Sequence, residues 1–208
     1  IDYSDMPEIE KWVLNEVYKL SKKIIQFTQN YQLGDIYREV YDFCNDDLSS
    51  FYFDIRKDTL YCSSYDSVER RSCRTVLDIL FNCICTWLAP ILCFTTEEAW
   101  KTQNIDENES VHLKEYFKPN DVWNNDTLSK KWEIIRNLRL KVTNKIEEKR
   151  REGLIGSSLE AVINLEVPTN YFKILSNLNL SEIFICSKAE FKVSNDLEND
   201  EIRVNCKK

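Results

Sequence analysis

Apolar residues that recur every three or four positions constrain the fold of this 208-residue chain most. Between residues 9 and 31 they lie on one face of a predicted helix. They are Ile9, Val13, Val17, Leu20, Ile24, Phe27 and Tyr31. Ser4 and Asp5 precede Pro7 and Glu8, and a capping side chain followed by proline and an acid is typical of a helix start. A single apolar face must be buried, so we predict a helical bundle.

Four further segments predict helices of this bundle. The second helix covers residues 36–55 and ends at the charged Arg56-Lys57-Asp58 sequence. A third begins near residue 68 and ends or kinks at residue 90, and Thr95 or Thr96 is predicted to cap a short helix that runs through Trp100. The fourth long helix covers residues 127–151 and ends at two glycines. Residues 101–126 lack a period and predict an irregular connection.

The pattern changes after residue 157 to short alternating runs. Residues 161–167, 183–186 and 201–206 predict strands, and residues 170–179 predict a helix between the first two. The predicted fold class is therefore mainly α, with a helical bundle at residues 1–156 and a small α+β subdomain at residues 157–208. Three glycines and four prolines are few for a turn-rich β protein, which supports this interpretation.

Charge is distributed unevenly along the chain. The net charge is -7, which by itself argues against a nucleic-acid partner, because lysine and arginine supply most of the affinity for phosphate. Residues 129–153, however, hold nine basic and four acidic side chains. This one basic segment in an acidic chain is a candidate RNA-binding element.

Candidate RNA contacts lie on two helices and one turn. In the third helix Arg71 and Arg74 share the face opposite the apolar stripe, and Arg70 lies at its border. Aromatic and guanidinium planes stack on the splayed bases of RNA loops, so turn tyrosines such as Tyr31 and Tyr61 are also candidates. The predicted RNA-binding residues are Arg70, Arg71, Arg74, Arg136, Arg139, Lys141, Lys145, Arg150 and Tyr31.

Each candidate also has an ordinary structural interpretation. Arg74 and Asp78 are spaced to form an ion pair on a solvated helix face. Arg136, Arg139 and Arg150 lie near the apolar stripe of the fourth helix and could extend along the edge of the core. Tyr31 could be a packing side chain.

Catalytic and metal sites have little support in the sequence. The one histidine, His112, falls in a polar segment without a clear nucleophile, so no catalytic residue is predicted and an independent hydrolase is the weakest hypothesis. The eight cysteines form no Cys-x-x-Cys pair, and we expect them to be reduced thiols of a cytoplasmic protein, with no metal site. Asp78, Asn82 and Pro90 interrupt the apolar run at 76–94, which favours a buried helix over a membrane span.

Several stretches of the sequence are more specific than an amphipathic helix requires. Residues 47–61 read Asp-Leu-Ser-Ser-Phe-Tyr-Phe-Asp-Ile-Arg-Lys-Asp-Thr-Leu-Tyr, and residues 155–161 read Ile-Gly-Ser-Ser-Leu-Glu-Ala. Residues 87–92 read Trp-Leu-Ala-Pro-Ile-Leu, and residues 96–100 read Thr-Glu-Glu-Ala-Trp. Together they resemble the anticodon-binding helical domain of bacterial-type isoleucyl-tRNA synthetases and its C-terminal junction region. The last two motifs also suit the valyl and leucyl enzymes, which remain alternatives.

The resemblance implies a helical bundle of the class I synthetase anticodon-binding type that binds the anticodon arm of isoleucine tRNA. In that family a separate domain attaches isoleucine using ATP and Mg²⁺, and many bacterial relatives carry a C-terminal zinc module. The His-Ile-Gly-His and Lys-Met-Ser-Lys-Ser signatures of the catalytic domain are absent from this sequence. We therefore expect a monomeric, cytoplasmic RNA-binding fragment with no cofactor, DNA partner or membrane of its own. A helical protein-interaction scaffold is the rival hypothesis from another class.

Overall fold

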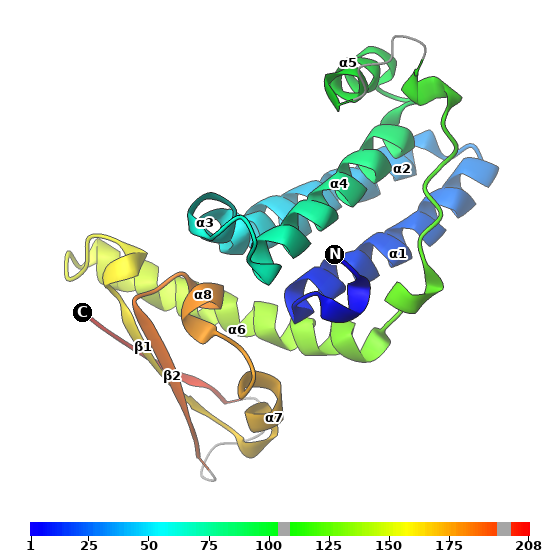
Figure 1. Ribbon diagram of the computed structural model, residues 1–208. Helices are drawn as coiled ribbons and strands as arrows, with labels where there is room; N and C mark the ends of the chain where they lie inside the picture. The colour runs from blue at the N-terminus through cyan, green and yellow to red at the C-terminus, as the bar shows by residue number, and fades with distance from the viewer. Residues whose placement is uncertain (104–108, 195–200) are drawn as a thin grey trace. The chain divides into compact units, whose positions relative to one another are not determined.

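The computed structural model describes residues 1–103, 109–194 and 201–208 (Figure 1). The chain divides into two compact units, residues 1–129 and 130–208, each of which is described by itself. Most of the fourth long helix belongs to the second unit, whereas the predicted domain boundary follows that helix at residue 156. The domain boundary at residue 156 stays a prediction.

The first unit is built from antiparallel helices. Helix α1 (Glu8–Gln29) packs against α2 (Leu33–Asp42) and α4 (Val68–Leu88), and these three helices lie side by side (Figure 1). The mainly α fold class predicted from the apolar spacing is confirmed. The largest fully buried side chains here include Leu14, Ile24, Ile36, Tyr52 and Trp87.

The second predicted helix is longer and less regular than expected. Helix α2 continues through a π-helical segment, Phe43–Phe53, into α3 (Asp54–Cys62). The spacing of five residues between buried Phe43 and Leu48 fits the i to i+5 hydrogen bonding of a π-helix. The prediction that the helix ends at the charged residues 56–58 is wrong, because Arg56 is buried rather than solvated.

Arg56 is buried because it binds a carboxylate on another helix. Its Nε donates to Oε1 of Glu10 at 2.6 Å, and its Nη2 donates to Oε2 at 2.7 Å. The Tyr52 hydroxyl lies 3.3 Å from the same Oε1. Burial raises the pKa of Glu10, and the hydrogen bonds from Arg56 oppose that shift. This charged contact joins α1 to α3 directly before the loop that leads into α4.

Helix α4 begins and ends near the predicted positions. Ser67 caps its start by accepting a hydrogen bond from the Arg70 backbone N–H, and the helix ends at Leu88, before Pro90. Helix α5 (Cys93–Gln103) starts earlier than the predicted cap at Thr95 or Thr96. None of the helices in the described part of the chain has the length and apolar character needed to cross a membrane.

The predicted irregular connection after α5 is described only in part. Two single turns of 3-10 helix lie at Val111–Leu113 and Asp121–Trp123. Residues 104–108 of the predicted connection lie outside the described residues. At its end, the backbone N–H of Asn125 donates to the side chain of Asn15 on α1, which ties the connection to the helical unit.

The second unit contains α6 (Asp126–Arg151) and a three-stranded sheet of order β2-β1-β3. The apolar stripe predicted for α6 is buried, at Trp132, Ile135, Leu138, Val142 and Ile146. Strand β1 (Val162–Val167) pairs in parallel with β2 (Lys188–Val193) and antiparallel with β3 (Arg203–Lys207). The short helices α7 (Phe172–Leu175) and α8 (Leu180–Phe184) complete the unit.

Two predictions for this unit are wrong. Residues 183–186 do not form a strand, because Ile183 and Phe184 are the buried end of α8, and Ile185 then turns the backbone at φ 53°. The second strand is instead β2, where Lys188, Glu190 and Lys192 alternate with apolar residues, a period of two that the sequence reasoning overlooked. The helix predicted over residues 170–179 is shorter, with a 3-10 turn at Thr169–Tyr171 before α7.

Gly153 ends α6 in a conformation that side chains disfavour, with φ 72°. We expect Gly153→Ala to lower the free energy of unfolding by about 1 kcal/mol, because a Cβ atom disfavours the left-handed region. Gly34 in α2 is the matched control, since it has ordinary φ and an added methyl group would meet open space there, and Gly34→Ala should stabilise by about 0.4–1 kcal/mol. Urea denaturation measures the free energy of unfolding of both variants. Equal changes for the two would contradict a left-handed backbone at Gly153.

Candidate nucleic-acid interface

The first two turns of α4 present two of the predicted arginines to solvent. Arg71 and Arg74 are exposed, and neither forms an ion pair with any residue that the structure describes. The alternative ion pair between Arg74 and Asp78 is absent from the described contacts. Both guanidinium groups are therefore available to a phosphate, which arginine binds through two parallel hydrogen bonds.

Arg70 is arranged differently from its two neighbours. Its side chain is half-buried, and Nη1 donates to the Ser63 carbonyl oxygen at 2.7 Å. Its guanidinium carbon lies 4.2 Å from the centre of the Tyr65 ring. The structure thus places Arg70 in contact with the α3–α4 loop, residues 63–67, instead of leaving it open to solvent.

Tyr65 is a candidate that sequence reasoning missed. It lies in the α3–α4 loop and is 76% exposed, beside the arginines of α4. The available signal was an aromatic residue in an otherwise polar loop, five positions before an arginine. Apolar periodicity carries no information about such a loop residue, because periodicity reports only on packed faces.

Tyr31 is not brought together with the arginines. It is 91% exposed, so its predicted place in the apolar stripe is wrong, and its backbone has φ 56° in the turn after α1. Because α1 and α2 are antiparallel, this turn and the α3–α4 loop lie at opposite ends of the helices (Figure 1). Tyr61, at the end of α3, is exposed and near that loop in sequence.

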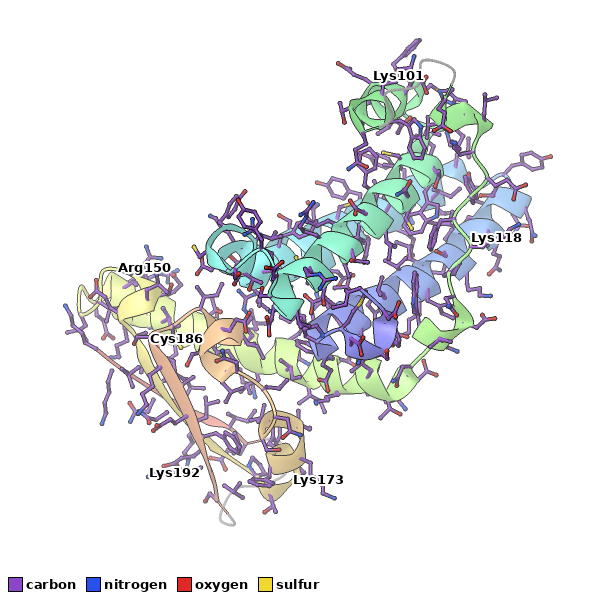
Figure 2. The ribbon with its side chains drawn as sticks, viewed as in Figure 1. Lys101, Lys118, Arg150, Lys173, Cys186 and Lys192 are labelled. Atoms are coloured by element: carbon purple, nitrogen blue, oxygen red, sulfur yellow. The ribbon has the colours of Figure 1, made fainter. Side chains whose placement is uncertain are left out.

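Three basic side chains near the C-terminal end of α6 form ion pairs with nearby glutamates. Lys145 contacts Glu148 at 2.6 Å, Lys149 contacts Glu152 at 2.7 Å, and Arg150 contacts Glu147 at 2.7 Å. The hydrogen bond with Glu148 raises the pKa of Lys145. Figure 2 shows Arg150 at the C-terminal end of this helix.

The other three candidates on α6 differ in exposure. Arg136 and Arg139 are half-buried and already interact with neighbouring groups. Lys141 is exposed and forms no ion pair within the described ranges 1–103, 109–194 and 201–208. Among the α6 candidates, Lys141 is therefore the cation whose charge is most available to a phosphate.

Among the described residues, the ring of His112 contacts the backbone of α5. Its Nε2 lies 3.2 Å from the backbone carbonyl oxygen of Cys93. Glu97 accepts hydrogen bonds from the Ser110 hydroxyl at 2.8 Å and from the Val111 N–H at 3.0 Å, and these bonds lower the pKa of its carboxyl. This carboxylate therefore holds the backbone of the connection.

The cysteines form no disulfide bond, and five of them are buried. All eight are unpaired, and burial raises the pKa of the Cys73 thiol to about 11. Over the described residues, no three histidine, cysteine, aspartate or glutamate side chains gather where they could hold a metal ion. The exposed arginines of α4 remain the chemically distinctive feature of the first unit.

Comparison with known proteins gives consistent matches over most of the chain. A family model described as the anticodon-binding domain of tRNA ligase matches residues 10–166. The isoleucine–tRNA ligase of Gluconobacter oxydans is 42% identical over 190 residues, which cover 91% of this chain and 20% of that protein. The isoleucine–tRNA ligase of Agrobacterium fabrum is 45% identical over 188 residues, 90% of this chain and 19% of that protein. The isoleucine–tRNA ligase of Zymomonas mobilis is 42% identical over 201 residues, 94% of this chain and 21% of that protein.

Proposed function

Because this chain belongs to the family of anticodon-binding domains of tRNA ligases, we propose that it binds the anticodon arm of isoleucine tRNA as part of an isoleucine–tRNA ligase. The family match over residues 10–166 carries this proposal. The names of the relatives, which are isoleucine–tRNA ligases, support isoleucine tRNA over valine or leucine tRNA.

The exposed arginines supply the chemistry of this binding. Arg71 and Arg74 lie three positions apart on α4, so their side chains project from one helix face. Each can hold a phosphate oxygen pair and release condensed counterions, which makes affinity depend on salt. Lys141 on α6 is a further phosphate contact in the second unit.

Attachment of the amino acid is assigned to the rest of the parent protein. The chain spans about a fifth of the length of the curated relatives that it matches. ATP and Mg²⁺, and zinc where a C-terminal module is present, would act in those other parts. We expect this chain alone to bind tRNA as a cytoplasmic monomer without ligase activity.

Two arginine variants test the proposal. Fluorescence anisotropy should show that the chain binds isoleucine tRNA more tightly than valine tRNA, with affinity falling as salt rises. Replacing both Arg71 and Arg74 with alanine should weaken binding and reduce the slope of log K against log salt by roughly 1.5, since each phosphate contact contributes about 0.7–0.9.

Arg38→Ala is the matched control. Arg38 lies on α2, is exposed and pairs with Asp35 at 3.4 Å, and removing it deletes one positive charge at a site outside the predicted set. The slope of log K against log salt for Arg38→Ala should stay at the wild-type value. Equal binding of all tRNAs, or no binding by a folded chain, would reject anticodon recognition by these residues and favour the protein-interaction scaffold.

A further inference from the structure

The α3–α4 loop carries an aromatic ring that is held in place and still accessible. We propose that Tyr65 is the platform on which one unpaired base of the bound RNA stacks, and that Arg70 is a positioning residue for this ring. This inference rests on the proposed function, because it names how the same RNA is held. It also revises the role predicted for Arg70, which was a direct contact with RNA.

One face of the Tyr65 ring is covered and the other is open. The guanidinium carbon of Arg70 lies 4.2 Å from the ring centre, a stacking distance that covers a single face. The residue is nevertheless 76% exposed, so the opposite face of the ring remains in solvent. A flat, open aromatic face is what an unpaired base requires for stacking.

The backbone that carries Tyr65 is held by three hydrogen bonds. The Ser67 N–H donates to the Ser64 carbonyl oxygen at 3.1 Å, and Ser67 Oγ accepts from the Arg70 N–H at 3.3 Å. The Arg70 side chain donates to the Ser63 carbonyl oxygen at 2.7 Å. Arg70 therefore holds both the ring and its loop, and an ordered platform loses little conformational entropy when a base binds.

The other exposed aromatic side chains of the helical unit lack this arrangement. Tyr37 and Tyr41 stack on each other with ring centres 6.0 Å apart, so each covers a face of its neighbour. Tyr31, Tyr61 and Phe94 are at least 80% exposed, and among the described residues none of them has a ring or cation contact. Ordering such a side chain on a base costs entropy that Tyr65 has already lost.

The charges around the platform favour a base over a phosphate at Tyr65 itself. Asp66 directly follows Tyr65 and Glu69 lies in the first turn of α4; both are exposed, and they repel a phosphate that approaches the loop. Arg71 and Arg74 provide positive charge one turn further along α4. An RNA loop whose backbone contacts these arginines can place a neighbouring base on Tyr65.

Stacking and phosphate contact differ in their salt dependence, which gives the test. Binding of an isoleucine tRNA anticodon stem-loop is measured by anisotropy over a salt series for Tyr65→Ala, Tyr65→Phe and Arg70→Ala. Tyr65→Ala should weaken binding by about 5- to 150-fold with the salt slope unchanged, because a base stack is worth roughly 1–3 kcal/mol and carries no net charge. Tyr65→Phe retains the ring and should bind within about 2-fold of wild type.

Arg70→Ala separates positioning from direct contact. As a positioning residue it should weaken binding without changing the salt slope, and it should add little to the effect of Tyr65→Ala. A fall of about 0.7 in the slope would instead show that Arg70 contacts a phosphate, and would overturn its positioning role.

Abasic substitutions in the stem-loop identify the stacked base. With an abasic nucleotide at one loop position, wild type and Tyr65→Ala should bind equally, because the partner of the ring is missing. The inference would be overturned if Tyr65→Ala bound more weakly than wild type by the same factor at every abasic position, or if it bound the intact loop with wild-type affinity. The proposed function would stand in both cases. Failure of the wild-type chain to bind any tRNA would overturn the proposed function itself and this inference with it.

Discussion

Replacing Glu10 with alanine is expected to lower the free energy of unfolding by about 3–5 kcal/mol. The variant leaves the Arg56 guanidinium, whose residue is only 3% exposed, without the carboxylate that accepts its two short hydrogen bonds. It also removes the acceptor of the Tyr52 hydroxyl. The loss is large because a charge buried away from water has no solvent to replace its partner.

Urea denaturation followed by circular dichroism measures this effect. The matched control is Glu39→Ala, which breaks the ion pair of Glu39 with Lys23, 2.8 Å long but exposed, and should cost at most about 1 kcal/mol. Combining Glu10→Leu with Arg56→Met should recover most of the stability, since apolar side chains can replace a buried pair. If Glu10→Ala lowered the free energy of unfolding by less than about 1 kcal/mol, the stabilising role of the buried Glu10–Arg56 ion pair would be contradicted.

Trp87→Ala is expected to destabilise the chain by about 3–5 kcal/mol. Trp87 is 1% exposed on α4, and its removal leaves a cavity in the core of the helical unit. This helix also presents Arg71 and Arg74, so the proposed RNA-binding surface depends on how firmly the core holds α4. The variant should bind tRNA normally where it remains folded and lose binding together with its helical signal on heating.

Phe94→Ala is the control for this aromatic deletion. Phe94 is 92% exposed at the start of α5, so the same kind of truncation should change stability by no more than about 0.5 kcal/mol. Thermal unfolding of both variants, monitored by circular dichroism, compares them directly. Similar melting temperatures for the two variants would show that α4 is not anchored by its buried tryptophan.

The sequence alone predicted the long helices, apart from the end of the second one, and the family resemblance. The starts of α1 and α4 and the end of α6 follow from local signals: Pro7 with Glu8, the Ser67 cap, and Gly153. Such signals act within one or two turns, so they can be read from neighbouring residues. The exposure of Arg71 and Arg74 also follows from their position opposite the apolar stripe.

Only the tertiary structure decided which polar side chains are already engaged. Arg56 is buried because Glu10, distant in sequence, reaches it from another helix, and Ile183 belongs to a helix because of how α8 packs. Arg70 stacks on Tyr65 because the α3–α4 loop folds back on α4. Contacts of this kind depend on which segments meet in space, and hydrophobic periodicity does not contain that information. The periodicity therefore predicts the helices, while tertiary packing determines which arginines remain exposed and free of ion pairs among the described residues.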